Sequence, residues 1–167
     1  MVTLTFTDCI TLVDNAKGVS VKKGPLLYAL PVEEQVVVEG LRELGNKDFP
    51  RYSLYPASQW NYALCTDRKA RFAFVQGPVG KQPWRRDQNG LTITVTGRQI
   101  PDWKIKKVRR VLWANTARGR AQWADRPAIF TPKVRSVTPD TPLGPTTQLT
   151  LVPYGTTRLR IGIFPKL

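Results

Sequence analysis

The sequence contains no histidine, only two cysteines, and no run approaching the roughly 18 consecutive apolar residues of a membrane-spanning segment. Without histidine, the Ser-His-Asp and Cys-His arrangements of nucleophilic catalysis are excluded, and the commonest general base is missing. Cys9 and Cys65 cannot build a structural zinc site of the usual kind without further ligands. We therefore expect no metal, no cofactor and no membrane partner.

Acidic residues are also scarce, with 12 against 26 lysines and arginines, so the formal net charge is +14. Residues 98–135 alone carry eleven basic and two acidic side chains, a net charge of +9. Nucleic acid, an acidic polysaccharide or an acidic companion domain would each account for such an excess.

The N-terminal residues Met1–Phe6 lack the basic and apolar regions of a signal peptide. They start directly with strand-like alternation, which suggests a piece cut from a longer protein. At 167 residues we expect one domain, residues 1–167, with a sizeable core of its own. Cys9 and Cys65 fit either a disulfide in an oxidising compartment or two free thiols.

Alternation of apolar and polar residues predicts about eight strands, separated by turns rich in proline and glycine. It is clearest in Val2–Thr7 and Leu91–Thr96. Gln148–Val152 and Arg158–Phe164, joined by Pro153-Tyr-Gly155, are interpreted as a hairpin. The pattern indicates an all-β fold, a jelly-roll-like sandwich of two antiparallel sheets with at most one short helix.

Two segments have a weaker helical pattern. Val36–Leu44 mixes charged and apolar residues and ends at Gly45-Asn46, which could stop a short helix. Residues 105–112 fit either one side of a short helix capped by Asp102 or an irregular sheet edge.

The aromatic run from Tyr52 to Leu64 could form either the centre of the sandwich core or a stacking platform for sugars or bases. We assign it to core and inter-sheet packing. The predicted structural core includes Tyr28, Tyr55, Trp60, Tyr62 and Tyr154.

The other tryptophans are candidates for ligand stacking. Trp84 lies between Pro83 and Arg85-Arg86 in a loop-like segment and is the tryptophan most expected to be exposed. Trp103, Trp113 and Trp123 recur at intervals of ten within the basic stretch; they could form a stacking row or simply cover sheet edges. The candidate glycan-binding residues are Trp84, Arg85, Arg86, Trp103, Trp113 and Trp123.

Four segments in this order resemble the C-terminal β-sandwich of the beta-L-arabinofuranosidase-like glycoside hydrolases, family 127 and its uncharacterised relatives. They are Gly24–Leu30 (GPLLYAL), Tyr55–Leu64 (YPASQWNYAL), Gly97–Trp103 (GRQIPDW) and Leu149–Ile161 (LTLVPYGTTRLRI). In that family an (α/α)6 barrel carries the catalytic cysteine and the zinc site. Neither Cys9 nor Cys65 matches the clustering of that site, so no catalytic residue can be carried over.

The resemblance implies a non-catalytic accessory domain that stabilises its own (α/α)6 barrel. With it we expect contact with polysaccharide, and the basic excess extends that expectation to acidic polysaccharide. The resemblance also implies that the intact glycoside hydrolase is periplasmic or extracellular. The alternative is a free-standing basic module for nucleic acid or acidic polysaccharide. No helix-turn-helix, zinc finger or ribonucleoprotein motif accompanies the basic stretch, so nucleic acid is the less favoured partner.

Overall fold

The computed structural model describes residues 8–15, 18–39, 51–67, 71–105, 107–112, 122–129 and 136–167. Its strands are β1 (Ile10–Asn15), β2 (Gly18–Lys23), β3 (Leu26–Pro31), β4 (Glu34–Glu39), β5 (Arg51–Pro56), β6 (Tyr62–Leu64), β7 (Ala73–Gln76), β8 (Leu91–Gln99), β9 (Lys107–Leu112), β10 (Gln122–Ile129), β11 (Thr146–Pro153) and β12 (Arg160–Ile161). The helical content of these residues is one 3₁₀ turn, η1 (Tyr154–Thr156). The predicted strand Val2–Thr7 lies outside the described residues.

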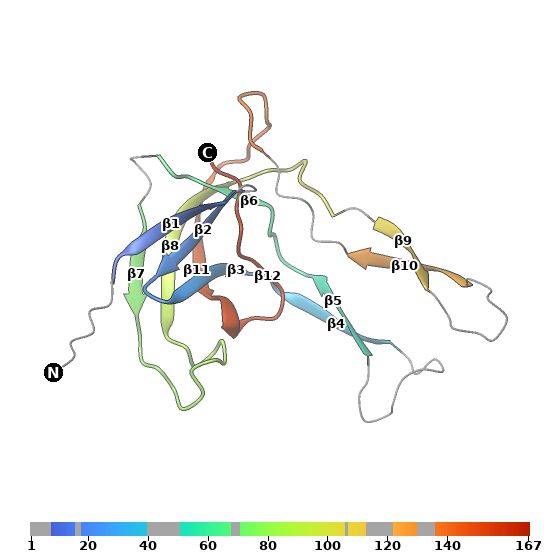
Figure 1. Ribbon diagram of the computed structural model, residues 1–167, viewed down its shortest axis with the longest axis horizontal. Coiled ribbons are helices and arrows are strands. Elements are labelled where there is room, and N and C mark those ends of the chain that lie inside the picture. The colour runs from blue at the N-terminus through green and yellow to red at the C-terminus, as the bar shows by residue number, and fades with distance from the viewer. Residues whose placement is uncertain are drawn as a thin grey trace.

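Antiparallel pairing links the larger sheet in the order β1-β2-β3-β11-β8-β6, with β12 added to β3 and β7 added to β8. Strand β11 joins its two halves, because Thr146–Leu151 pairs with β8 while Val152 and Pro153 pair with β3. The two halves pack against each other (Figure 1), which makes the fold the predicted all-β, antiparallel, sandwich-like architecture.

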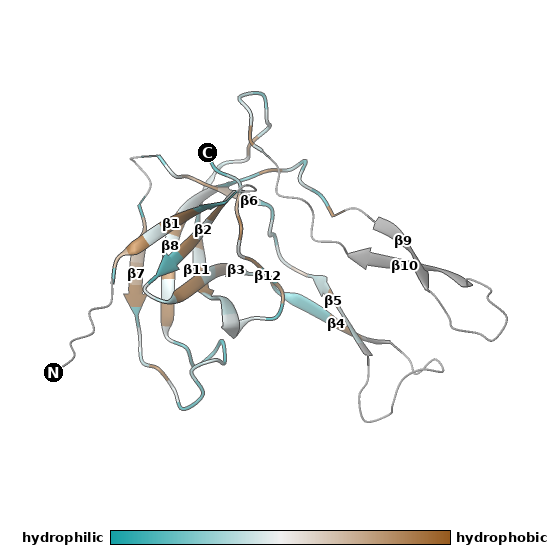
Figure 2. Ribbon diagram, viewed as in Figure 1, coloured by the Kyte–Doolittle hydropathy of each residue, from teal (hydrophilic) through white to brown (hydrophobic). Residues whose placement is uncertain are grey.

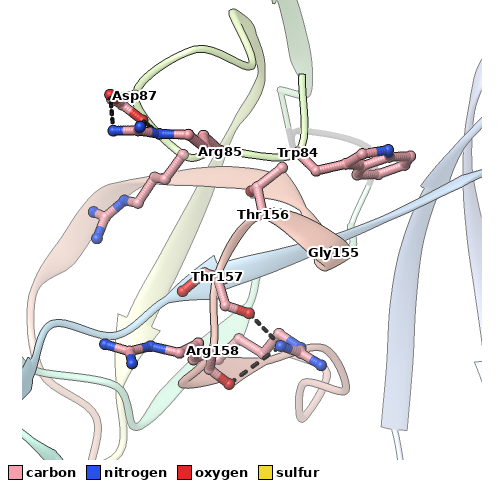
Figure 3. A pocket seen from close by; sticks show the side chains of 9 residues that line it. Trp84, Arg85, Asp87, Gly155, Thr156, Thr157 and Arg158 are labelled. Atoms are coloured by element: carbon pink, nitrogen blue, oxygen red, sulfur yellow. Dashed lines mark hydrogen bonds and ion pairs between the residues drawn. The ribbon is translucent and has the colours of Figure 1, made fainter. Parts of the chain in front are cut away.

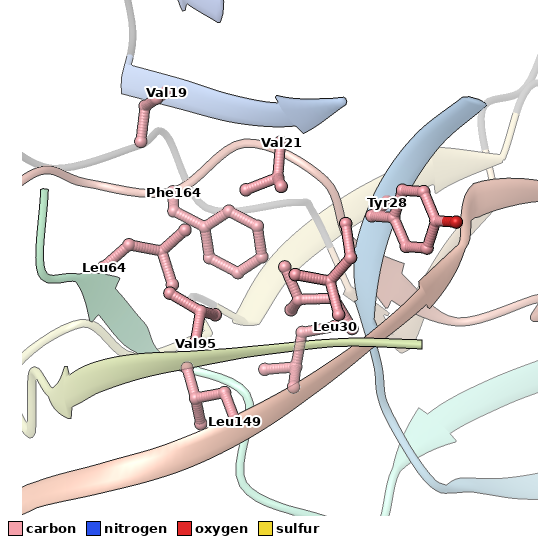
Figure 4. Close-up of a cluster of buried hydrophobic side chains, with 10 residues drawn as sticks. Val19, Val21, Tyr28, Leu30, Leu64, Val95, Leu149 and Phe164 are labelled. Atoms are coloured by element: carbon pink, nitrogen blue, oxygen red, sulfur yellow. The ribbon is translucent and has the colours of Figure 1, made fainter. Parts of the chain in front are cut away.

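The main core lies between these two halves. Val19, Val21, Tyr28 and Leu30 come from β2 and β3. Facing them are Leu64, Ile93, Val95, Leu149 and Leu151 from β6, β8 and β11, with Phe164 inserted between (Figure 4). In β8 the buried residues alternate with partly exposed threonines, as the period-two pattern of the sequence predicts.

A second cluster lies beside this core and contains Val32, Trp60, Ala63, Ile100 and Trp103. The rings of Trp60 and Trp103 meet edge to face, with their centroids 5.1 Å apart. The buried Asn61 donates hydrogen bonds from Nδ2 to the carbonyl oxygens of Ile100, at 2.7 Å, and of Trp103, at 3.1 Å. The buried amide therefore satisfies two backbone acceptors next to the tryptophan pair.

Two ribbons form separate two-stranded sheets, β4 with β5 and β9 with β10, and both project from the sandwich (Figure 1). The helix predicted at Val36–Leu44 is therefore wrong for residues 36–39, which lie in β4. Three consecutive valines, Val36 to Val38, explain this, since β-branched residues favour strands. Residues 40–44 lie outside the described residues. Residues 107–112 form β9 rather than the alternative helix.

The predicted C-terminal hairpin is also wrong. The 3₁₀ turn η1 redirects the chain after β11, so that Arg160 and Ile161 pair with β3 instead of β11. The chain then pairs at Phe164 with Val19. This path inserts Phe164 into the sandwich and leaves Tyr154 and Gly155 of η1 exposed at its surface, while Thr156 is buried.

Both cysteines are free thiols, Cys9 exposed and Cys65 partly buried, so the disulfide alternative is not realised. Burial and the nearby Asp67 carboxylate raise the pKa of the Cys65 thiol. The neutral thiol is the weaker nucleophile, so Cys65 is not an activated cysteine.

Candidate binding groove

Among the described residues, no cluster of three or more histidine, cysteine, aspartate or glutamate side chains is suited to a metal ion. Within the same ranges, no helix is long and apolar enough to cross a membrane. Chemistry-bearing side chains instead gather along one surface groove.

The groove has a volume of about 410 Å³ and lies between the loop that follows β7 and the η1 turn (Figure 3). It is lined by Trp84, Arg85, Arg86, Asp87, Gly155, Thr156, Thr157, Arg158 and Arg160. Four of these nine residues are arginines and one is a tryptophan, a combination of charge-assisted donors with an aromatic surface. Figure 2 shows the loop between β7 and β8 as largely hydrophilic, in contrast to β7 itself.

The loop between β7 and β8 holds its own shape through hydrogen bonds. The Gly80 amide donates to the Gln88 carbonyl at 2.8 Å, and Asn89 Nδ2 donates to the Pro83 carbonyl at 2.7 Å. Gly90 closes the loop with φ of +68°, and a Cβ there would lie 2.4 Å from the Pro78 carbonyl oxygen. This bonding supports the exposed tip that carries Trp84, Arg85 and Arg86.

Trp84 is 62% exposed, yet its ring is seated on the backbone of η1. A Cβ on Gly155 would lie 3.2 Å from the ring atom Cε3, so glycine leaves the ring room to approach. An exposed tryptophan supported on one side by backbone presents a pre-ordered apolar surface, which lowers the entropic cost of binding a ligand.

Tyr154 occupies the neighbouring position and is 40% exposed. Its ring lies over Gly162, where a Cβ would come within 3.1 Å of Cε2. The Arg160 guanidinium carbon lies 3.8 Å from the ring centroid, a cation–π contact that fixes both groups. The prediction that Tyr154 is part of the core is therefore corrected: the 3₁₀ turn at the end of β11 places it at the surface.

Three of the four arginines pair with carboxylates at the groove. Arg85 donates to both oxygens of Asp87, at 3.1 and 2.9 Å, and these hydrogen bonds lower the pKa of that carboxyl group. Arg86 pairs with Glu33 at 2.7 Å, and Arg158 pairs with Glu34. Arg160 instead donates from Nη1 to the carbonyl oxygens of Thr157 and, at 3.1 Å, of Arg158.

The structure brings together three of the six predicted glycan-binding residues, Trp84, Arg85 and Arg86. Trp103 does not join them. The Trp103 amide donates to the Ile100 carbonyl in a tight turn, and the ring folds back onto Trp60, so the side chain is 4% exposed. The assignment of Trp103 to ligand stacking is therefore corrected.

The structure does not test the predicted glycan contact of the other two tryptophans. Trp113 lies outside the described residues, and Trp123 belongs to β10, where its backbone pairs with Val111. The structure adds groove residues that the sequence reasoning missed, above all Arg158 and Arg160. Both lie in the segment predicted to be the second strand of a hairpin, although their alternation with Leu159 and Ile161 could also have indicated a row of exposed cations after a turn.

The fold and the groove thus define an antiparallel β-sandwich with a surface site of aromatic and guanidinium groups. Comparison of the chain with known protein families, curated proteins and solved structures gives no match. The resemblance to the β-sandwich of the arabinofuranosidase-like hydrolases therefore stays a prediction.

Proposed function

We propose that the chain is a non-catalytic accessory β-sandwich of a carbohydrate-active enzyme and that it binds glycan in the groove beside Trp84. The observation that carries the proposal is the exposed Trp84 ring, seated on Gly155 and surrounded by arginine side chains. Trp84 and Tyr154 come from two segments about seventy residues apart in the sequence. The Trp84 ring packs against Gly155, and the Tyr154 ring packs against Gly162.

The chemistry of the groove matches that of a sugar. A pyranose or furanose ring has an apolar C–H surface that packs on an aromatic ring, and a rim of hydroxyl groups that accept hydrogen bonds. Small-molecule sites commonly combine an aromatic surface with a few placed polar groups in this way. Guanidinium groups supply strong donors for the rim, while Asp87 and the threonine hydroxyls supply acceptors.

The catalytic work is assigned to a separate domain. The resemblance places it in an (α/α)6 barrel, which would be the principal partner of the sandwich in a periplasmic or extracellular protein. Asp87, Glu33 and Glu34 are each engaged by an arginine, which suits binding better than general acid–base catalysis.

Affinity electrophoresis tests the proposal on the whole chain. The panel would hold arabinan, xylan, pectin and a glycosaminoglycan, with single-stranded DNA as a competitor, at low and physiological salt. We expect retardation by at least one glycan at physiological salt, and a loss of about tenfold or more in affinity in Trp84→Ala, in line with roughly 1–3 kcal/mol for aromatic stacking.

Val79→Ala is the matched control, because Val79 is also exposed on the loop between β7 and β8 but does not line the groove. It should bind like the wild type. Retardation by no glycan, or equal retardation of Trp84→Ala, would contradict the proposal. Binding of DNA alone, unaffected by Trp84→Ala, would favour the alternative of a nucleic-acid module that uses the basic residues elsewhere.

A further inference from the structure

Arg160 differs from the other three arginines of the groove, since no carboxylate pairs with it anywhere in the described ranges. Nη1 is occupied by two backbone carbonyls. Nε is shielded from solvent and has no hydrogen-bond partner within those ranges. Nη2 likewise makes no bond there, but it is not among the shielded atoms. One terminal nitrogen of a fixed guanidinium is thus left for a ligand.

We infer that the groove selects a sugar that carries a carboxylate, a uronic acid, and that Arg160 binds this carboxylate. The inference rests on the proposed function and adds the class of ligand to it. Guanidinium–carboxylate pairing already occurs three times at the groove, through Asp87, Glu33 and Glu34. A ligand carboxylate would give the fourth arginine the same kind of partner.

The charge balance of the groove leaves one positive charge for one ligand carboxylate. Four guanidinium groups face three protein carboxylates, so the groove and its ion-pair partners carry a net charge of +1. One uronate residue carries a charge of −1 and neutralises it. A binding face for a nucleic-acid strand would instead present several cations without competing carboxylates.

The setting of Arg160 also favours a fixed orientation of the ligand. The guanidinium stacks on Tyr154, which in turn lies on Gly162, and the two carbonyl contacts restrict its rotation. Because the guanidinium plane is held in this way, the hydrogen bond that Nη2 donates to a carboxylate has a defined direction, which the flexible ammonium of lysine does not provide. The Trp84 ring lines the same groove and is available to the C–H surface of the sugar.

Matched oligosaccharides test the inference. Galacturonate oligomers would be compared by titration calorimetry at physiological salt with the same oligomers methyl-esterified at each carboxylate. We expect the wild type to bind the acid form at least about tenfold more tightly, consistent with a charge-assisted hydrogen bond. Arg160→Gln and Arg160→Lys should both abolish that preference, while circular dichroism confirms that each is folded.

Lys81→Gln is the charge-matched control, because it also removes one positive charge. Lys81 is exposed on the loop between β7 and β8 but does not line the groove. It should keep the preference for the acid form. Equal binding of acid and ester, or binding of a neutral glycan only, would overturn the inference and leave the proposed function intact. Failure of every glycan would overturn the proposed function itself. Equal competition by single-stranded DNA would replace uronate by phosphate as the ligand chemistry and so also refute the inference.

Discussion

The molecule holds two pairs of aromatic residues in opposite settings. Trp60 and Trp103 meet edge to face in the interior and are 9% and 4% exposed. Trp84 lines the groove, and Tyr154 contacts Arg160 beside it; the two side chains are 62% and 40% exposed. Ring size and polarity are similar in the two pairs, so the difference must come from the backbone and from the neighbouring polar groups.

Around the buried pair, polar groups form hydrogen bonds with one another. Asn61 donates to the carbonyls of Ile100 and Trp103, so few donors or acceptors are left there for a ligand. At the exposed pair, glycines 155 and 162 let the rings rest directly on backbone, and guanidinium groups surround them. An aromatic residue supports binding when backbone fixes one side of it and a polar group beside it keeps a donor for a ligand, as Arg160 does.

The largest expected effect comes from breaking the buried pair with Trp60→Ala. Removing this ring leaves a cavity beside Trp103, and such truncations cost roughly 3–5 kcal/mol of unfolding free energy. Urea denaturation followed by circular dichroism measures it. Folded Trp60→Ala should still bind glycan, because Trp60 does not line the groove. An unfolding free energy close to that of the wild type, together with loss of glycan binding, would show that Trp60 belongs to the binding site.

A smaller effect is expected from lifting Trp84 off its glycine with Gly155→Val. The added side chain meets the Trp84 ring, since even a Cβ would come within 3.2–3.3 Å of it. We expect about a tenfold loss in glycan affinity and a change in stability of about 1 kcal/mol or less, as is usual at surface positions. Titration calorimetry and urea denaturation measure the two quantities.

The double variant Gly155→Val/Trp84→Ala makes this test specific. If glycine acts only by seating the ring, the two losses of affinity will not add, because both remove the same contact. Additive losses would show that Gly155 serves the ligand in another way, for example through its backbone.

Much of the fold followed from local patterns. Period-two alternation in Leu91–Thr96 placed Ile93 and Val95 on the buried face of β8, because register and burial are tied in a strand. The pairing partner of a strand is not local, however. Arg158–Phe164 has the same alternation whether it returns along β11 or crosses to β3. The sequence indicates a turn at Pro153-Tyr-Gly155, but it does not specify the direction in which the chain leaves that turn.

The candidate site was predictable only in part for the same reason. The Pro-Trp-Arg-Arg segment indicated an exposed tip, and Trp84, Arg85 and Arg86 do line the groove. Trp103 looked equivalent in the sequence, but the turn from Ile100 directs its ring inward. Arg160 reaches the groove, with Tyr154 stacked against it, through the path of the C-terminal segment, which no pattern within that segment specifies.

The smallest effect concerns the charges of the groove and is tested with Arg85→Gln. The hydrogen bonds from Arg85 lower the pKa of Asp87, so this pair favours the folded state above the unfolded pKa of about 3.9. That contribution is lost as the pH falls through the lower, folded-state pKa. In Arg85→Gln the Asp87 pKa should return toward its ordinary value, as read from NMR titration of the side-chain carboxyl carbon. Both partners are largely exposed, so the urea midpoint at neutral pH should not change measurably.

Arg86→Gln serves as the control because Arg86 pairs with Glu33 and should leave the Asp87 titration in place. If Asp87 titrates identically in Arg85→Gln and wild type, the pair does not persist in solution and both groups are open to a ligand. A clear shift confined to Arg85→Gln would show that Arg85 is already engaged, which leaves Arg160 as the guanidinium free to select the ligand.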